Sequence, residues 1–416
     1  MEELYTLERE VGRGSYGVVF EGHVSKTGQC VAIKRLPCRS PEGIELYLQE
    51  LWAMRATAKN HANVIALHGC LLQTGPKTLQ PLKPGQLPLE LVESALKGSV
   101  SGGSKTQERE HSPFSQSKTQ RRKSHSDRSR PQLQDRTNTC FARSRQDRTH
   151  SYSSRPKLLD RTNTELFRPR KRPAPEEEEE ASGLRRCSAL WLVMEYCDGG
   201  DLNQYLLSGA PDPELNHSVV QQLGSAVAFL HGLHITHRDL KPDNVLVCLT
   251  PAGPVVKVAD FGLCKMSVGQ AKCDLTRQHF SSTCGSDFYM APEVWGGLSY
   301  TAQADIFSLG VMFWAVLERI TFLEEGSTQE QLGAYVCKGR WLMPLGEALS
   351  ENPDLQLCIP LKARRAPPLP PPPGQAVCAL LQDMLASDPE ARPRAAQLEG
   401  RICSALSEGT DCHGPG

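Results

Sequence analysis

The sequence lacks an excess of either charge, a long hydrophobic run and closely paired cysteines. Lysine and arginine together number 47, as do aspartate and glutamate, in a chain of 416 residues. A neutral chain has no overall attraction to nucleic acid or to an anionic membrane. No run approaches the roughly 18 apolar residues that a membrane-spanning helix needs, and the start, MEELYTLEREVGRG, lacks the apolar segment of a signal peptide. We therefore expect a soluble protein inside the cell, with no membrane partner.

Metal-binding cysteine pairs and aromatic residues are also scarce. The 15 cysteines are scattered, none forms a CxxC pair, and no set of cysteines and histidines has the spacing of zinc ligands. This pattern favours reduced thiols over a disulfide framework or a zinc module. Aromatic residues make up 6% of the chain, too few to support nucleic-acid binding by base stacking. We expect no sequence-specific nucleic-acid partner.

The N-terminal part of the chain predicts mainly strands. Short apolar runs broken by glycines between Tyr5 and Lys34 are typical of antiparallel strands joined by tight turns. Apolar residues recur at helical spacing over residues 41–58, which predicts a helix. Further strand-like runs lie at Val64–Leu72 and Leu89–Val92. Together these elements predict a small, strand-rich lobe.

The composition changes between Ser99 and Gly183. Serine, threonine, glutamine, arginine and proline dominate there, and aliphatic residues are few. The sequences SKTQ and DRTNT each occur twice, but these repeats are too short and irregular to stack as a solenoid. A segment that cannot bury apolar surface cannot offset its ordering entropy, so we predict that it is disordered.

The second half of the chain predicts a larger, mainly helical lobe. It opens with a strand-like run at Leu190–Met194, and helical apolar patterns follow at Val219–Leu230, Ala304–Leu317 and Val377–Leu385. The fold class that follows is α+β with two lobes.

Four segments therefore divide the chain. Residues 1–98 are the first part of the small lobe, and residues 99–183 are the insert. Residues 184–405 form the connection between the lobes and the helical lobe, and residues 406–416 are a C-terminal tail.

A glycine-rich motif, G-x-G-x-x-G-x-V, lies between two of the predicted strands. Glycines let the backbone approach phosphate oxygens and donate N–H bonds without a Cβ in the way. The motif alone is weak, because dinucleotide-binding proteins share it, but there a helix follows and here a strand follows. The residues that would surround the phosphates are Gly12, Arg13, Gly14, Ser15, Tyr16, Gly17, Val18 and Val19.

A lysine at the end of the next apolar strand suggests what those phosphates belong to. Lys34 ends the run Val31–Ile33 and would contact the α- and β-phosphates of ATP, held in place by a glutamate. Glu50, on the predicted helix that follows, is the best placed glutamate. Taken alone, either residue would be interpreted as an ordinary surface charge.

The sequence HRDLKPDN, at residues 237–244, decides between these interpretations. Asp239 would orient the attacking hydroxyl, Lys241 would balance charge on the phosphoryl group, and Asn244 would bind magnesium. Asp260, in the DFG sequence, would be a second magnesium ligand, because Mg²⁺ prefers carboxylate and amide oxygens. An Ala-Pro-Glu sequence ending at Glu293 then closes the segment that positions the substrate. Chance does not explain these motifs in this order.

At these motifs the chain resembles the eukaryotic protein kinases, over about residues 5–98 and 189–398. The resemblance implies a bilobal protein-kinase fold, with ATP and Mg²⁺ between a strand-rich N-lobe and a helical C-lobe. It also implies that proteins are the substrates. Met194 would be the gatekeeper, the backbone of Glu195 and Cys197 would bind adenine, and Asp201 would reach the ribose. An apolar lining around the base, equally interpretable as ordinary core, would comprise Val11, Val19, Ala32 and Leu246.

The resemblance extends to substrate class and to structural contacts. Lys241 and Ser286 match serine/threonine kinases rather than tyrosine kinases. Glu293 is expected to pair with Arg392 as a structural ion pair, and Asp305 to brace the HRD turn. The sequence thus predicts a protein serine/threonine kinase. The alternative is a nuclear scaffold that uses a kinase fold for protein binding.

A finer resemblance is to the CLIK-type serine/threonine kinases. The segments EVGRGSYGVV, LVMEYCDGGDL, KVADFGL, DFYMAPEVW and LERITF carry it. It implies nuclear residence and a partner among actin-associated PDZ–LIM proteins. The insert departs from that pattern.

The insert adds candidate regulatory signals. Basic clusters at residues 121–123 and 168–173 predict recognition by a nuclear import adaptor, with a solvated polar tail as the alternative. Ser124 and Ser126 lie beside the first cluster, where phosphorylation would cancel positive charge.

Two further segments carry weaker signals. The run Pro367–Pro373 predicts polyproline II, either a ligand for SH3 or WW domains or, as we favour, a stiff loop. Phosphorylation of Ser282 would order the loop before the Ala-Pro-Glu sequence by pairing with Arg238.

Overall fold

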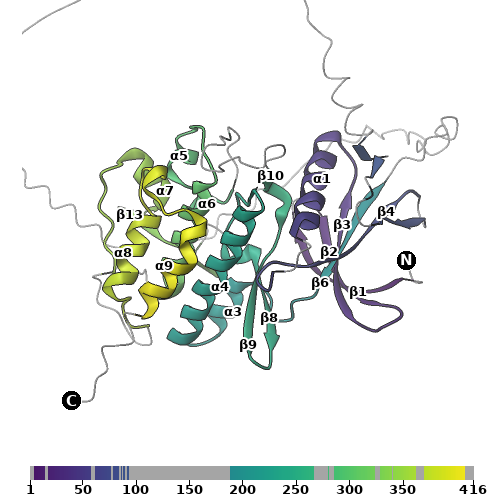
Figure 1. Cartoon of the computed structure of the whole chain (residues 1–416), viewed down its shortest axis with the longest axis horizontal. Coiled ribbons are helices and arrows are strands. Elements are labelled where there is room, and N and C mark those ends of the chain that lie inside the picture. The colour runs from purple at the N-terminus through teal and green to yellow at the C-terminus, as the bar shows by residue number, and fades with distance from the viewer. Residues whose placement is uncertain are drawn as a thin grey trace, which may run out of the picture.

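The computed structural model has two lobes, one built around a sheet and one built of helices (Figure 1). The predicted α+β class is therefore correct. The structure describes residues 4–14, 17–57, 61–75, 78–83, 86, 88–89, 91–92, 188–266, 280, 285–323, 328–339, 341–361 and 370–407. The predicted insert, with its basic clusters and serines, lies outside these residues.

The N-lobe is a six-stranded sheet with the order β1-β2-β3-β6-β4-β5 and antiparallel pairing throughout. β6 pairs with both β3 and β4, so the chain returns to the middle of the sheet after residue 187. The strands are β1 (Tyr5–Gly14), β2 (Gly17–Val24), β3 (Cys30–Pro37), β4 (Leu67–Gln73), β5 (Leu79–Pro81) and β6 (Ala189–Glu195).

Alternation along β3 and β6 gives the sheet two buried faces. Val31 and Ile33 pack on one face with Trp191 and Val193. Leu36 and its neighbours in β6 point to the other face and join the main core of the molecule. Successive side chains of a strand point to opposite faces, so one strand supplies both clusters.

Helix α1 (Pro41–Ala56) lies beside the sheet, as predicted (Figure 1). Ser40 caps it by accepting the Gly43 N–H at 3.2 Å, and Pro41 occupies the first turn, where its missing N–H costs nothing. The helical register places Leu48 and Leu51 in the main core. The same register places Glu50 inward, which matters for the site.

Two strand predictions in this region need correction. The strand expected from Val64 begins at Leu67, because the backbone near Val64 pairs with Val258 instead. The strand expected at Leu89–Val92 is wrong, since Leu89, Leu91 and Val92 are helical. Leu91 is fully buried in the main core, and a short apolar run does not distinguish a buried helical turn from a strand.

The C-lobe is built mainly of helices. The predicted helices at Val219–Leu230, Ala304–Leu317 and Val377–Leu385 correspond to α4, α6 and α8. The helices are α3 (Leu202–Ser208), α4 (Pro213–Gly232), α5 (Pro292–Trp295), α6 (Gln303–Glu318), α7 (Leu345–Glu351), α8 (Gln375–Met384) and α9 (Ala395–Ser407). α9 runs past the predicted start of the tail at residue 406.

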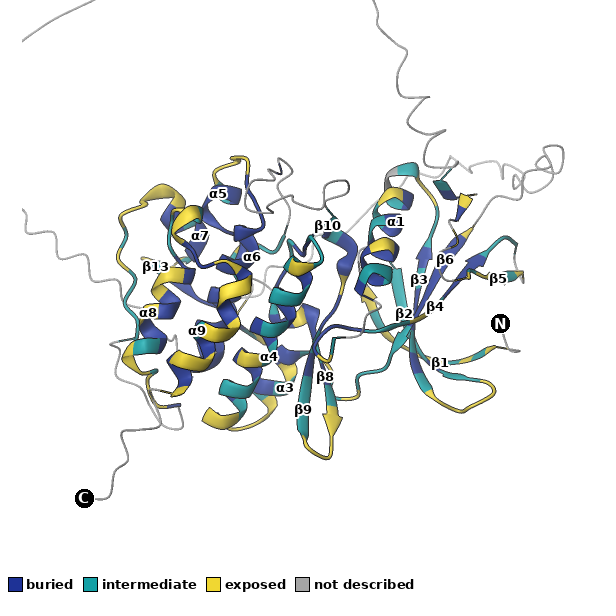
Figure 2. Ribbon diagram, viewed as in Figure 1, coloured by how far each residue is buried: buried dark blue, intermediate teal, exposed yellow. Residues whose placement is uncertain are grey.

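Helix α6 is the centre of the C-lobe. Nearly all its residues are buried, whereas α9 alternates buried and exposed positions (Figure 2). A helix that is apolar on all sides must be surrounded by protein. α6 therefore provides a rigid base for the segments that pack on it. Within the described residues, no helix is long and apolar enough to cross a membrane.

Short strands that the sequence analysis did not anticipate complete the C-lobe. The most important pair, β8 (Val245–Thr250) with β9 (Gly253–Val258), follows the HRDLKPDN sequence and leads to Asp260. The others are β7 (Ile235–Thr236), β10 (Lys265–Met266), β11 (Thr321–Leu323), β12 (Glu330–Leu332), β13 (Tyr335–Lys338) and β14 (Trp341–Pro344).

Candidate active site

The glycine-rich motif forms the turn between β1 and β2. Gly14 pairs with Gly17 across the turn, and Ser15 and Tyr16 lie outside the described residues. A Cβ on Gly17 would lie 2.3 Å from the Arg35 carbonyl oxygen, so packing against β3 requires this glycine. A Cβ on Gly12 would meet only Val19, at an ordinary 3.9 Å. Protein packing therefore does not explain Gly12, and the predicted approach of a phosphate to this turn stays a prediction.

Lys34 lies between two carboxylates. Its Nζ is 2.6 Å from Glu50 Oε1 and 3.0 Å from Asp260 Oδ1. The predicted pairing of Lys34 with Glu50 is thus present and joins β3 to α1, and the contact of Lys34 with Asp260 adds the segment after β9. The three residues are distant in sequence, and the structure brings them together at one point.

The charges of this triad follow from its surroundings. Burial opposes the charge of Lys34, but Glu50 and Asp260 outweigh it and raise the pKa of the ammonium. Burial raises the pKa of Glu50, against the effect of Lys34. Desolvation also opposes ionisation of Asp260, but Lys34 outweighs it and lowers the pKa of that carboxyl. A separation of 2.6 Å is that of a charge-assisted hydrogen bond, so we take Lys34 and Glu50 as a charged pair.

The HRDLKPDN segment arranges its polar side chains around Asp239. Asn244 Nδ2 donates to Asp239 Oδ2 at 2.9 Å and to the Asp239 carbonyl oxygen at 2.8 Å. Ser286 donates to Asp239 Oδ1 at 2.9 Å and accepts from Lys241 Nζ at 2.7 Å. Lys241 Nζ is also 3.8 Å from Asp239 Oδ2. The hydroxyl of Ser286 therefore links the carboxylate to the ammonium.

Asp305, in the first turn of α6, binds the backbone at the start of the HRDLKPDN segment. Its carboxylate accepts the backbone N–H groups of His237 and Arg238, each at 2.8 Å, and lies 2.9 Å from His231 Nε2. Burial opposes the charge of Asp305, but the hydrogen bond from His231 outweighs it and the pKa is lowered. Arg238 has a φ of 70°, a strained conformation for a residue other than glycine. The predicted bracing of the turn by Asp305 is present.

Asn244 and Asp260 fit the requirements of a magnesium ion. The amide nitrogen of Asn244 is used by Asp239, which leaves its oxygen for another partner. Nearly half of the Asp260 side chain is exposed, at 45%. Within the described ranges, no three or more His, Cys, Asp or Glu side chains gather as a protein-only metal site. Mg²⁺ commonly binds one or two protein ligands together with substrate phosphates, and these residues fit that pattern.

The connection between the lobes contains the predicted adenine-binding residues. Ala32 pairs with Met194 across β3 and β6. The Glu195 side chain accepts the Ala66 N–H at 2.7 Å and lies 3.0 Å from Lys257 Nζ. The side chain of Glu195 is therefore turned into the protein, and its backbone N–H donates to the Ala66 carbonyl oxygen at 3.0 Å.

Other predicted residues of the adenine and ribose sites lie as follows. Asp201 caps α3 through the Gln204 N–H at 2.8 Å and forms an isolated bridge with Leu246. Val11 is 41% exposed. One carboxylate oxygen of Asp201 thus has a structural role that the sequence analysis did not foresee.

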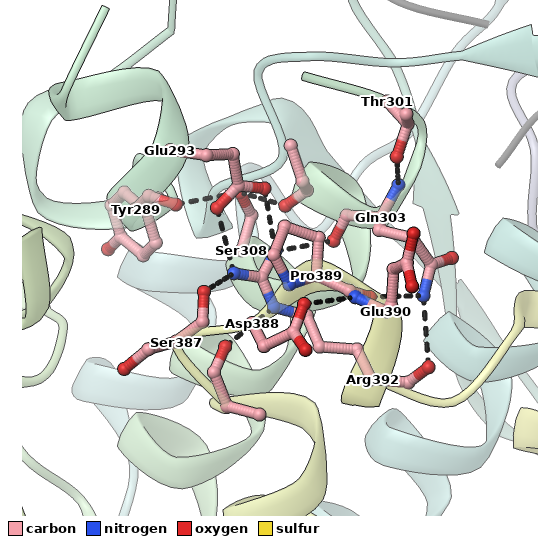
Figure 3. Close-up of polar contacts among 12 residues, drawn as sticks. Tyr289, Glu293, Thr301, Gln303, Ser308, Ser387, Asp388, Pro389, Glu390 and Arg392 are labelled. Carbon is pink, nitrogen blue, oxygen red and sulfur yellow. Dashed lines mark hydrogen bonds and ion pairs between the residues drawn. The ribbon is translucent and has the colours of Figure 1, made fainter. Parts of the chain in front are cut away.

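Glu293 and Arg392 form the predicted buried ion pair, at the centre of Figure 3. Two parallel N–H···O bonds of 2.8 Å join them. Arg392 also donates to the backbone oxygens of Ala386, Gln303 and Ser387. The pair fixes the end of the Ala-Pro-Glu sequence to the segment before α9.

Several functional contacts were missed from sequence. Ser286 was noticed for its resemblance alone, and nothing in the pattern indicated that it joins Asp239 to Lys241. His231 and Lys257 were not singled out, since a lone histidine or lysine on an amphipathic element gives no signal. Ser282 lies outside the described residues, so its pairing with Arg238 stays a prediction.

Comparison with known proteins agrees with this geometry. The family described as "Protein kinase domain" matches residues 182–400, and the family "Protein tyrosine and serine/threonine kinase" matches residues 5–94. Serine/threonine-protein kinase unc-51 of Caenorhabditis elegans is 35% identical over 183 residues, which are 40% of this chain and 20% of that protein. Probable serine/threonine-protein kinase KCC4 of Saccharomyces cerevisiae is 35% identical over 166 residues, 39% of this chain and 15% of that protein. The chain thus spans a fifth or less of the length of these relatives. With a match over more than half its length and the described site in place, the chain belongs to the protein kinase family.

Proposed function

We propose that the chain transfers the γ-phosphoryl group of ATP to serine or threonine hydroxyls of other proteins. The observation that carries this proposal is the Lys34 ammonium held between Glu50 and Asp260. Both relatives named above are serine/threonine-protein kinases by description. A scaffold that only used the fold would have no need for a buried lysine held between two carboxylates.

Nucleotide binding is assigned to the cleft side of the N-lobe. The backbone N–H groups of the β1–β2 turn would donate to phosphate oxygens, and Lys34 would neutralise phosphate charge. Glu50 prevents Lys34 from swinging away, because it is 1% exposed and 2.6 Å from the ammonium. The glutamate therefore positions the lysine and does not touch the nucleotide.

The acceptor hydroxyl is assigned to Asp239. Hydrogen bonds from Ser286 and Asn244 hold both of its carboxylate oxygens, so the carboxylate is oriented before substrate arrives. Asp239 then accepts a hydrogen bond from the substrate hydroxyl and aims its oxygen at the phosphorus. Lys241 supplies positive charge beside the same oxygens.

Magnesium ligation is assigned to Asn244 and Asp260. The ion, when bound, neutralises phosphate charge that builds up during transfer. Asp260 also contacts Lys34, so the residue that would hold the metal is tied to the one that would hold the phosphates.

The test is a phosphorylation assay with the purified full-length chain, radiolabelled ATP and an array of serine, threonine and tyrosine peptides. We expect magnesium-dependent labelling of serine and threonine peptides. Lys34→Met and Asp260→Asn should each lower kcat/KM by about 100-fold or more. Lys338→Met is the matched control, because it removes an exposed lysine 2.9 Å from Glu351, far from the cleft residues in sequence.

Two outcomes contradict the proposal. Equal activity in wild type and Lys34→Met, with unchanged melting temperatures, would mean that the triad does not serve catalysis. Absence of labelling in a wild-type protein that still binds partners in cells would favour the scaffold.

We also propose that the chain is a CLIK-type kinase of the nucleus with a PDZ–LIM protein as partner. The support is the set of segments EVGRGSYGVV, LVMEYCDGGDL and DFYMAPEVW, together with the basic clusters at residues 121–123 and 168–173. Alanine replacement of both clusters should shift a fluorescent fusion from nucleus to cytoplasm. An unchanged distribution of the fusion would count against nuclear import through these clusters. Failure of a PDZ–LIM protein to co-purify with the full chain would count against the proposed partner.

Phosphorylation of Ser282 is proposed to activate the enzyme. The support is its place before the Ala-Pro-Glu sequence and the presence of Arg238 in the HRD sequence. Ser282→Ala should lower the activity of protein purified from cells and leave its fold unchanged. Full activity of Ser282→Ala excludes activation through this serine.

A further inference from the structure

Two thiols meet where the connection between the lobes runs beside β8. Cys197 follows β6, and Cys248 lies within β8. Their Sγ atoms are 3.0 Å apart. Both cysteines are free and only partly buried, so small molecules can reach them from solvent. The two residues are far apart in sequence, and nothing in the scattered cysteine pattern indicated this contact.

The backbone around the two thiols is held in place. The Gly199 N–H donates to the Val247 carbonyl at 2.8 Å, and the Val247 N–H donates to the Gly200 carbonyl at 2.9 Å. The Leu249 N–H donates to Asp198 Oδ1 at 2.8 Å. These bonds join the residues that follow Cys197 to the residues on both sides of Cys248. The thiol contact is therefore a fixed feature of the fold and does not depend on side-chain rotation alone.

This arrangement differs from that of other cysteines in the described part of the chain. Cys264, Cys358 and Cys378 donate to backbone carbonyl oxygens, which are unreactive toward sulfur. Cys197 and Cys248 instead face each other, and Cys248 also lies 3.8 Å from the Tyr196 carbonyl oxygen. An adjacent second thiol is what turns oxidation of one cysteine into a reversible bond.

The charges near the pair favour one reactive sulfur. The hydrogen bond with Cys197 lowers the pKa of the Cys248 thiol, whereas the hydrogen bond with Cys248 and burial raise the pKa of Cys197. Glu195 and Lys257 also face the thiols, but they pair with each other at 3.0 Å, so their opposite effects offset. Of the two thiols, Cys248 therefore loses its proton more readily and is the better nucleophile.

We propose that Cys197 and Cys248 are an oxidation site at the nucleotide cleft, which closes to a reversible disulfide when the protein meets hydrogen peroxide. The Cys248 thiolate attacks peroxide, the O–O bond breaks, and sulfenic acid forms with release of hydroxide, which takes up a proton to become water. The Cys197 sulfur then attacks the Cys248 sulfur and expels hydroxide, which takes the Cys197 proton and leaves as water. The two thiols lose two electrons, and one peroxide molecule is reduced to two of water.

The consequence for nucleotide binding rests on the function proposed above. A disulfide brings sulfur atoms to about 2.05 Å, so its formation draws Cys197 toward β8. The backbone of Cys197 is assigned to adenine, and displacement of a positioning group by about 1 Å weakens binding and catalysis strongly. Oxidation is therefore an off-switch that displaces the connection between the lobes at Cys197 and leaves Lys34 and Asp239 in place.

The experiment uses the full-length chain, reduced with dithiothreitol, desalted and treated with hydrogen peroxide. Peptide mapping without reductant should find a cross-linked peptide that contains both Cys197 and Cys248 and that dithiothreitol removes. Cys248→Ser should abolish the cross-link, and Cys403→Ser, which replaces an exposed cysteine outside the pair, should retain it. A map in which both thiols stay reduced, or in which Cys248 becomes sulfinic acid with Cys197 untouched, overturns the proposal.

A nucleotide titration then tests the consequence. The Kd of a fluorescent ATP analogue should rise about tenfold on oxidation in wild type and in Cys403→Ser, and should not change in Cys248→Ser. Formation of the cross-link with an unchanged Kd overturns the off-switch. A third outcome is a protein that forms the cross-link after peroxide treatment but binds no nucleotide even when it is reduced. That outcome supports the oxidation site and counts against the proposed function, so the two failures are distinguishable.

Discussion

Removing the charge of Glu293 should destabilise the C-lobe by about 3 kcal/mol. The Arg392 side chain is 0% exposed and the Glu293 side chain 6% exposed, and two bonds of 2.8 Å join them. Breaking one partner of a buried pair costs about 3–5 kcal/mol, because a buried charge is left uncompensated. In Glu293→Gln the amide oxygen still accepts one N–H, and Arg392 keeps its three backbone acceptors. These remaining contacts place the loss at the lower end of the range.

The reverse change should cost more. Arg392→Met leaves the Glu293 carboxylate buried without its cation, leaves backbone oxygens of residues 303, 386 and 387 without this donor, and removes the guanidinium 5.1 Å above the Phe307 ring. We expect a loss of about 4–5 kcal/mol. The double variant should lose less than the sum, since the single changes share one interaction.

Urea unfolding followed by tryptophan fluorescence measures these losses by linear extrapolation. Arg401→Met is the matched control, because Arg401 pairs with Asp383 on the surface, where both side chains are 40% or more exposed. An exposed pair contributes at most about 1 kcal/mol. If the free energy of unfolding of Glu293→Gln lies within about 1 kcal/mol of the wild-type value, the reasoning is refuted.

Three further changes test other parts of the site. Asp305→Asn should lower the free energy of unfolding by about 3 kcal/mol at pH 7. Because the pKa of Asp305 is lowered in the folded state, its contribution is present above the ordinary value of about 3.9 and is lost as the pH falls through the folded pKa. Urea titrations at several pH values should therefore show that the free energies of unfolding of Asp305→Asn and wild type approach each other below about pH 4. Gly17→Ala should lower the melting temperature, since the new Cβ would lie 2.3 Å from the Arg35 carbonyl oxygen. Gly12→Ala should leave the melting temperature nearly unchanged and raise only the KM for ATP, since its Cβ would meet only Val19. Ser286→Ala should lower kcat about tenfold in peptide phosphorylation with little change in melting temperature, because it removes one hydrogen bond at the Asp239 carboxylate.

The sequence was most informative where chemistry demands one residue type. Lys34, Asp239 and Asp260 were found because phosphoryl transfer needs an ammonium and carboxylates at set intervals. Glu50 was found differently, from the period of α1, which turns that residue inward with Leu48 and Leu51. Residue identity and helical register thus predicted the pairing of Lys34 with Glu50, whereas the ion pair of Lys34 with Asp260 was not predicted.

Prediction failed where a role depends on a partner far along the chain. Ser286 could not be placed between Asp239 and Lys241, because no sequence period connects residues more than 40 positions apart. The same holds for Cys197 and Cys248, whose meeting depends on how β8 lies beside the hinge. At Leu89–Val92 the failure was local, since buried strands and buried helical turns are equally apolar.

Two residues of the buried helix α6 anchor the segments that carry the candidate site. Asp305, at its start, fixes the backbone of the HRD turn, and Ser308, one turn on, donates to the Tyr289 carbonyl at 2.7 Å near the Ala-Pro-Glu sequence. Both anchoring residues belong to a helix with almost no exposed surface, which cannot shift without disturbing the core. Among the groups assigned to chemistry, Lys34 and Asn244 are also buried, whereas the Asp260 side chain is 45% exposed. Burial of the two anchors thus fixes the backbone that carries Asp239, while Asp260 stays accessible to solvent.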